Sequence, residues 1–189
     1  MSKALLIMDF INDIVSKNWK LAGKWYPEHI EKNNVIPNLK NCIKKAREKN
    51  ILIVFIKIWF DNNYTLQPKN SPLFWKANEF MALNKDAWWW DFVKELKPQE
   101  EDYKITKHRI SWFYQTNLDL ILRNNQINTL YLTWVSTDLV VESTARDAHD
   151  KDFNINIISN CCAAANEEEH QKSLNTLQKI WNIIKEDEF

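Results

Sequence analysis

The sequence predicts an α/β fold built around a parallel β-sheet. Short runs of apolar and β-branched residues alternate with longer segments whose apolar residues recur at helical spacing, a pattern typical of repeated strand–helix–strand units. The strand runs are almost continuously apolar, as expected for strands that are buried on both faces. The chain has 189 residues and is expected to form a single domain over residues 1–189, with a core that needs no disulfide bonds.

Five runs are candidate strands. The first ends directly before Asp9, and the second, ILIVFIKI, is nearly all apolar. In chain order the runs cover residues 4–8, 51–58, 103–106, 128–134 and 155–158. Their length and composition suit the buried strands of a parallel sheet.

Four segments between these runs have helical periodicity. They cover residues 35–49, 117–123, 138–151 and 167–184. The last begins with three glutamates, which suit a helix N-terminus, and places Leu174, Leu177, Ile180 and Ile184 on one face. Residues 59–98 have no clean periodicity, and we expect them to form an excursion that covers the functional site.

Composition excludes several classes of partner and location. Twenty-five basic and 25 acidic residues balance to a net charge of zero, so we expect no nucleic-acid partner. No stretch of 18 apolar residues occurs, which predicts no membrane span. Three cysteines are too few for a disulfide framework and the N-terminus lacks a signal-peptide pattern, so the expected location is cytoplasmic.

Chemically useful residues follow the strands. In a parallel sheet, ligands bind beyond the carboxyl ends of the strands, where Asp9, Lys107 and the segment that begins at Trp134 all fall. That segment, TWVSTDLVVESTARDAHD, reads as strand, tight turn and helix, and such a turn presents backbone N–H groups that can hold an oxyanion. Taken singly, Asp9 also suits a turn cap and Lys107 a solvated charge.

Four stretches together resemble the isochorismatase-like hydrolases, also called the cysteine hydrolases. They are ALLIMDFIND, KHRISWFYQTNLDLIL, TLYLTWVSTDLVVESTARDAHDKDF and ISNCCAAANEEEHQKSL, which occur in the family order and cover most of the chain. The resemblance implies a Rossmann-like, three-layer α/β/α fold with a six-stranded parallel sheet.

The resemblance also implies site residues. Catalytic members of the family use an Asp and a Lys, which match Asp9 and Lys107, and a Cys, whose position here is Val140. A valine has no lone pair with which to attack a carbonyl, so the chain is identified as a member that lacks the nucleophilic cysteine.

The turn before Val140 is the second feature that the resemblance implies. The family places a cis peptide after the valine of this motif, here between Val135 and Ser136, and we expect it in this chain. Val135, Ser136, Thr137 and Val140 then form the oxyanion turn.

Two alternatives concern the missing nucleophile. Cys161 and Cys162 follow a strand and could stand in, but cysteine is commonly buried as a small apolar residue. Isochorismatases proper also lack the cysteine, and in them the Asp acts as a general acid on a vinyl ether while water attacks. Asp9 and Lys107 could support that chemistry.

No metal or other cofactor is expected. Related nicotinamidases bind a metal through an Asp and two histidines after the second strand, and here Asp61 has no histidine near it in sequence. His149 and His170 are expected on solvated helix faces.

The favoured function is hydrolysis of a small polar substrate, at an amide C–N or an enol-ether bond, by an Asp/Lys pair. The alternatives are a catalytically inactive member that binds a small molecule and a scaffold protein of this fold. The family resemblance also implies a homo-oligomer.

One compositional anomaly needs an explanation. About 13 glycines would be usual at this length, and the chain has one, Gly23, beside ten tryptophans. Tryptophan stands at or near positions where the family has glycine, including Trp25, Trp59, Trp75 and Trp134. Our hypothesis is that UGA codons read as glycine in the source, a code known in some uncultured bacteria, were translated as tryptophan. The alternative is a lineage with unusual aromatic usage.

Overall fold

The computed structural model describes residues 2–17, 25–85 and 90–189, and it contains the expected parallel sheet. Six strands lie in the order β3-β2-β1-β4-β5-β6, and every neighbouring pair is parallel. The strands are β1 (Ser2–Met8), β2 (Leu52–Ile58), β3 (Tyr103–Lys107), β4 (Ile127–Val135), β5 (Asn154–Ala163) and β6 (Asn182–Ile184). The prediction of an α/β fold with a six-stranded parallel sheet is confirmed.

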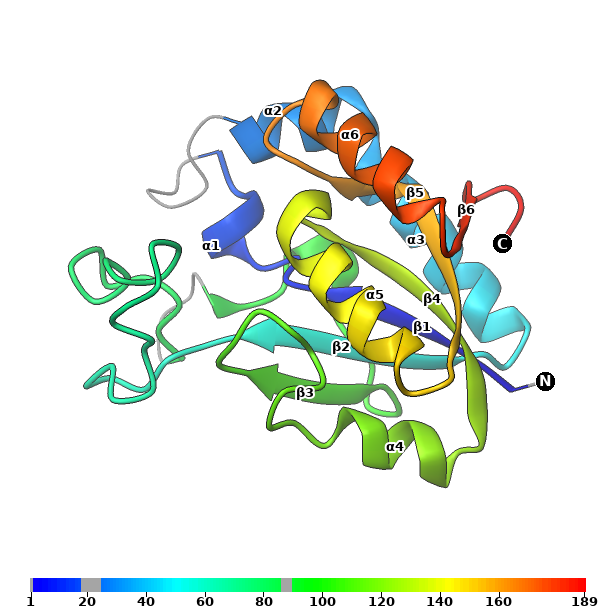
Figure 1. Ribbon diagram of the computed structural model, residues 1–189, viewed down its shortest axis with the longest axis horizontal. Helices are drawn as coiled ribbons and strands as arrows, with labels where there is room; N and C mark the ends of the chain where they lie inside the picture. Colours follow the sequence, from blue (N-terminus) through cyan, green and yellow to red (C-terminus); the bar gives the residue numbers. More distant parts are fainter. Residues whose placement is uncertain (1, 18–24, 86–89) are drawn as a thin grey trace.

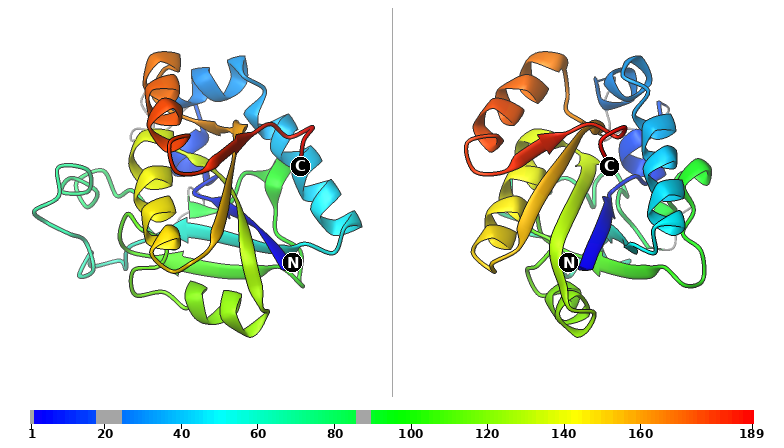
Figure 2. Two further views of the ribbon diagram at one scale, coloured as in Figure 1. Left: turned by 45° about the vertical axis from the view of Figure 1, so that its right-hand side comes forward. Right: turned by 90° about the vertical axis from the view of Figure 1, so that its right-hand side faces the viewer.

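Helices cover both faces of the sheet (Figures 1 and 2). The right-hand view of Figure 2 shows α3 on one side of the strands, and α5 and α6 on the other. The helical elements are α1 (Asn12–Val15), α2 (Trp25–Lys32), α3 (Val35–Glu48), the 3-10 turn η2 (Lys94–Leu96), α4 (Leu118–Asn124), the π-helical turn η3 (Thr137–Val141), α5 (Glu142–His149) and α6 (Glu167–Leu177).

The two central strands explain why the apolar runs form this sheet. In β1, residues 4–8 have no exposed surface, and each pairs with both β2 and β4: Leu5, for example, pairs with Ile53 and with Tyr131. Helix α3 buries Val35, Leu39, Cys42 and Ala46 at helical spacing. The continuous burial of β1 and the helical spacing of buried residues in α3 therefore both follow from a sheet that helices cover on its two faces.

The expectation of one helix over residues 167–184 is wrong at its C-terminal end. Helix α6 ends at Leu177, and Asn182–Ile184 form β6, which pairs with residues 156–158 of β5. Ile180, placed on the apolar face by the spacing, is 50% exposed. The unpaired edge of β5 offers backbone hydrogen bonds to an Asn-Ile-Ile segment, and this tertiary pairing outweighs local helical spacing.

The two adjacent cysteines also differ from expectation in their position. Cys161 and Cys162 lie inside β5 rather than beyond its end, and both are buried. Burial raises the pKa of the Cys162 thiol to about 12, and the pKa of Cys161 is raised by its contact with Cys42 and by burial. Both thiols are therefore protonated and unreactive near neutral pH.

The carboxyl ends of β1 and β2 point to the left in Figure 1, and residues 59–85 of the excursion project beyond them. Leu73, Phe74 and Leu83 of this excursion line a cavity at that edge, which places it where it was expected. Among the described residues, no helix has the length and apolar character needed to cross a membrane.

Several tryptophans have a buried indole N–H without a hydrogen-bond partner. In the described part of the chain these are Trp59, Trp90, Trp112, Trp134 and Trp181. A buried indole N–H usually finds an acceptor, and leaving one unpaired costs about 1–3 kcal/mol. Gly23 and Trp88 lie outside the described residues, and no described tryptophan has a positive φ. The unpaired indole N–H groups therefore support the hypothesis that glycine belongs at some of these positions, whereas the backbone angles add no support.

We predict that Trp134→Gly leaves the free energy of unfolding unchanged or raises it. Trp134 is 1% exposed, so truncation of a native core residue would cost about 3–5 kcal/mol, as we expect for the control Phe55→Ala. Denaturant unfolding of both variants checks this. A loss for Trp134→Gly as large as that of the control would show that tryptophan is native at this position.

Candidate active site

Asp9 is held at the carboxyl end of β1 by bonds to the neighbouring strand. Its backbone N–H donates to the carbonyl of Ile56 at 2.9 Å, and its carboxylate Oδ1 accepts from the N–H of Ile58 at 2.8 Å. Its φ of 54° is in the left-handed region, which is uncommon for a residue other than glycine. This backbone turn aims the carboxylate across the end of β2 toward β3.

Lys107, the last residue of β3, completes a buried ion pair. Its Nζ lies 2.7 Å from Oδ2 of Asp9, and it donates to the carbonyl of Ile110 at 3.2 Å. The two side chains are only 1% and 2% exposed. The predicted convergence of Asp9 and Lys107 at one sheet edge is therefore observed directly.

Burial shifts both members of this pair toward their neutral forms. The pKa of Asp9 is raised because burial outweighs the attraction of the Lys107 ammonium and the two hydrogen bonds. The pKa of Lys107 is lowered because burial outweighs the attraction of the Asp9 carboxylate. A carboxyl group whose pKa is raised is a stronger proton acceptor than a free carboxylate, which suits acid–base chemistry.

The turn after β4 faces this pair. The Val135–Ser136 peptide is cis, as expected, and η3 follows it before α5 begins at Glu142. The segment over residues 138–151, expected as one helix, is thus divided into this π-helical turn and a regular helix. Val140 and Ser136 line the cavity, whereas Thr137 is fully buried behind it.

One cavity of about 140 Å³ brings these residues together. Asp9 and Lys107 meet Val135, Ser136 and Val140 there, and most of the other lining side chains are apolar: Ile14, Tyr26, Ile58, Leu73, Phe74, Leu83, Trp134 and Leu139. The volume corresponds to roughly five water molecules. The Lys107 ammonium lies 4.9 Å from the centroid of the Trp134 ring, so the indole occupies part of the space above the ion pair.

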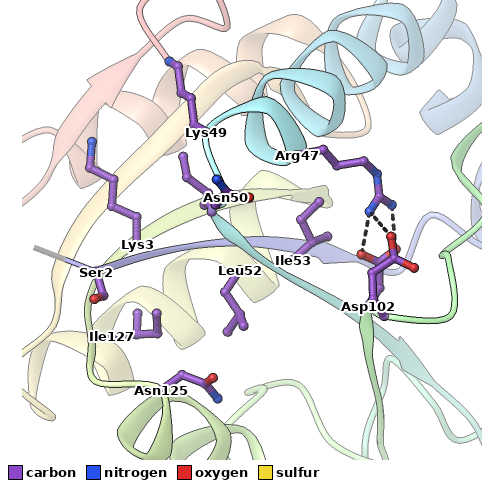
Figure 3. A pocket seen from close by; sticks show the side chains of 12 residues that line it. Ser2, Lys3, Arg47, Lys49, Asn50, Leu52, Ile53, Asp102, Asn125 and Ile127 are labelled. Atoms are coloured by element: carbon purple, nitrogen blue, oxygen red, sulfur yellow. Dashed lines mark hydrogen bonds and ion pairs between the residues drawn. The ribbon is translucent and has the colours of Figure 1, made fainter.

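A larger cavity, of about 550 Å³, lies at the opposite, amino-terminal edge of the strands (Figure 3). Two of the three cations that line it have polar partners, since Arg47 pairs with Asp102 at 2.7 Å and Lys49 donates to the carbonyl of Phe189, and the Lys3 ammonium lies 5.6 Å from the centroid of the Tyr131 ring. The smaller cavity is the better candidate site because it holds a buried charged pair with perturbed pKa values.

Sequence reasoning missed three polar residues around the candidate site. Tyr26 of α2 lines the cavity and hydrogen-bonds with Ser136. His170 was expected on a solvated face but is buried against Thr137, whereas His149 is exposed as expected. Asp13, in the same DFIND stretch as Asp9, is completely buried. No local signal indicated these positions, because their burial arises from contacts between segments far apart in the chain.

Among the described residues, no group of three His, Cys, Asp or Glu side chains is placed to hold a metal ion. Asp61 instead accepts a hydrogen bond from the backbone N–H of Leu66 at 3.2 Å, within the excursion.

Asp13 ties the excursion to the start of the chain. Its Oδ2 accepts the backbone N–H of Leu83 at 2.6 Å, and its Oδ1 is buried with no partner among the described residues. Burial raises the pKa of Asp13 to about 6, although the Leu83 N–H opposes the shift. Because Leu83 lines the cavity, Asp13 helps to hold this wall in place.

Known proteins resemble this chain in both sequence and structure. Residues 3–186 match the isochorismatase domain model. The isochorismatase family protein YwoC of Bacillus subtilis is 32% identical over 146 residues, covering 76% of this chain and 75% of YwoC. An isochorismatase-like hydrolase from Alkaliphilus metalliredigens is 30% identical in sequence, with a TM-score of 0.79 over 99% of this chain and 95% of its own.

The ureidoacrylate amidohydrolase RutB of Serratia proteamaculans is a further relative. It is 35% identical over 125 residues, which are 60% of this chain and 50% of RutB. The match thus spans half the length of that enzyme.

We predict that Asp13→Asn becomes increasingly more stable than the natural chain as the pH rises from 4 to 7. The folded-state pKa of about 6 lies above the ordinary 3.8, so the stability contributed by Asp13 is full below pH 3.8 and is lost as the pH rises through 6. The shift corresponds to about 3 kcal/mol. Urea unfolding at stepped pH measures it. Glu79→Gln, an exposed substitution in the same excursion, is the control, and a pH-independent difference for Asp13→Asn would contradict the assignment.

Proposed function

The chain belongs to the isochorismatase family, and from this premise we propose that it is a hydrolase that cleaves an amide C–N or enol-ether bond without a cysteine nucleophile. The observation that carries the proposal is the buried Asp9–Lys107 pair, with 2.7 Å between its charged atoms, on the floor of a cavity that the cis turn also lines. Asp9 is the proposed acid–base group and Lys107 its electrostatic partner.

For an amide substrate, water takes the role that the cysteine has in other members. Asp9 accepts a proton from the water, whose oxygen bonds to the carbonyl carbon. Backbone N–H groups around residues 136–140 stabilise the negative charge on the carbonyl oxygen. The C–N bond then breaks as Asp9 returns the proton to the leaving nitrogen, so the products are a carboxylic acid and an amine.

For an enol ether, Asp9 acts first as an acid. Its proton goes to the vinyl carbon, water adds to the resulting oxocarbenium carbon, and the C–O bond breaks with return of a proton to Asp9. The raised pKa of Asp9 supports this order, because it increases the protonated fraction near neutral pH. The Lys107 ammonium stabilises the carboxylate that the first step creates.

The size of the cavity supports a small substrate. At about 140 Å³ it accommodates only a few heavy atoms beside the ion pair. The amidohydrolase activity of RutB, a relative over part of the chain, supports the amide alternative.

The second candidate is a member that binds a small molecule without turnover. Val140 favours it, because a valine at the nucleophile position cannot form a covalent intermediate. Binding of a small amide or enol ether by the natural chain, without product formation, would support this alternative over the hydrolase.

We predict that Asp9→Asn abolishes hydrolysis of any substrate found in a screen of small amides and enol ethers. An amide side chain cannot exchange the proton, so we expect a fall in kcat of about 100-fold or more, with binding retained. Product formation measured by liquid chromatography, together with calorimetric binding, checks this. Hydrolysis that survives both Asp9→Asn and Lys107→Ala would place the chemistry elsewhere, and Cys161 and Cys162 would be tested next.

We also predict that Val140→Cys creates a reactive thiol. The new sulfur would lie in the same cavity as Asp9 and Lys107, and the ammonium and the turn N–H groups would lower its pKa. We expect iodoacetamide to alkylate it faster than Cys42, Cys161 or Cys162, which are all buried.

Val141→Cys is the matched control, because Val141 is adjacent but fully buried and does not line the cavity. The alkylation rates are measured by mass spectrometry. Equal rates for the two variants would show that Val140 does not occupy the nucleophile position.

A further inference from the structure

Two buried histidines lie behind the turn that follows β4. His29 comes from α2 and His170 from α6, and each is 5% exposed. Their ring centroids are 5.2 Å apart, so the two rings pack directly against each other. In Figure 1, α2 and α6 lie at the same, upper end of the molecule. Neither histidine lines the cavity, so neither is placed to touch a substrate.

His170 bonds directly to the turn. Its Nδ1 lies 2.9 Å from Oγ1 of Thr137, and Thr137 is completely buried. Thr137 directly follows Ser136. Ser136 lines the cavity, and its peptide bond with Val135 is cis. The Thr137 hydroxyl has no other hydrogen bond within the described chain, so His170 is the side chain that anchors this residue from behind.

The other histidine links the cluster to the surface. Nε2 of His29 donates to Oε2 of Glu167, the first residue of α6, at 3.1 Å, and Glu167 is half-exposed. Nδ1 of His29 is buried without a partner. His29 therefore stabilises the cluster without contacting the turn, which makes it a natural comparison for His170.

Charge in the cluster favours a neutral His170. Burial lowers the pKa of His170, His29 lowers it further, and Glu167 opposes the shift. On the other side of the turn, Ser136 hydrogen-bonds to Asp138 and to Tyr26. The pKa of Tyr26 is raised mainly by burial, and the charges of Asp138 and Glu169 raise it further. The turn is thus held from two sides, by His170 through Thr137 and by Tyr26 through Ser136.

We propose that His170 is a positioning residue, which acts through Thr137 to hold the turn of residues 136–140 so that its backbone N–H groups face the cavity, apart from the Val140 N–H, which donates to the Ser136 carbonyl at 3.4 Å. The proposal rests on the proposed function, because it assumes that these N–H groups stabilise negative charge there. Without the His170–Thr137 hydrogen bond, the turn would shift so that its backbone N–H groups no longer face the cavity. The Asp9–Lys107 pair would stay in place. A cavity that still binds but no longer stabilises an anion would result.

The test uses the thiol of Val140→Cys as an internal probe of that anion stabilisation. Its pKa is read from the iodoacetamide alkylation rate between pH 5 and 10, and the measurement needs no knowledge of the natural substrate. Adding His170→Leu should raise the thiol pKa and lower the alkylation rate at pH 7 by about tenfold, which is one pKa unit of lost thiolate stabilisation. Adding His170→Asn should restore the rate to within about twofold, because an amide places a polar atom near the position of Nδ1.

Two further variants make the result decisive. Thr137→Val removes the same hydrogen bond from the opposite end with little change in shape, so it should reproduce the effect of His170→Leu even if that variant folds poorly. His29→Gln alters the same cluster without contacting the turn, so it should change the unfolding midpoint but not the thiol pKa. An unchanged thiol pKa in both His170→Leu and Thr137→Val would overturn the proposal.

The outcomes also separate this proposal from the proposed function. If Val140→Cys alone is unreactive, the assumption that the turn stabilises an anion fails, and the hydrolase proposal loses support with it. If Val140→Cys is reactive but indifferent to His170 and Thr137, the positioning role alone is wrong. An effect of His29→Gln equal to that of His170→Leu would indicate general destabilisation and would likewise overturn the positioning role.

Discussion

The buried ion pair between Asp9 and Lys107 is the interaction on which the rest of the site depends. Removing two charges from water costs several kcal/mol for each ion, and the cost is recovered only where geometry and further hydrogen bonds are good. Here Asp9 also accepts the N–H of Ile58, and Lys107 also donates to the carbonyl of Ile110. These partners come from the ends of β1, β2 and β3, so the pair can form only when three strands end together.

Sheet topology explains why the turn after β4 faces this pair. The strand order places β2 and β3 on one side of β1, and β4, β5 and β6 on the other. The direction of strand addition reverses between β1 and β4, and such a switch point opens a crevice at the carboxyl edge. Asp9 lies on one side of that crevice, and Val135 and Ser136 lie on the other.

A layer of polar contacts behind the turn links helices that are far apart in sequence. Helix α2 contributes Tyr26 and His29, and α6 contributes His170, so the turn is held by two helices that meet at the edge of the sheet. Buried polar groups of this kind specify a single geometry only when they are well paired. Exceptions in the described chain include Nδ1 of His29, Oδ1 of Asp13 and the unpaired indole N–H groups.

The sequence by itself determined five of the six strands, their parallel arrangement, and the placement of Asp9 and Lys107 at their carboxyl ends, and the family resemblance added the position of Val140. Continuous apolar runs define buried strands, and residues that directly follow such strands must meet at one edge. Only the tertiary structure decided where the last helix ends, because β6 forms by pairing with a strand edge that no local pattern reveals. Tertiary structure also decided the burial of Asp13 and His170, since burial of a polar side chain depends on which distant segments cover it, and local spacing records only the face of its own element.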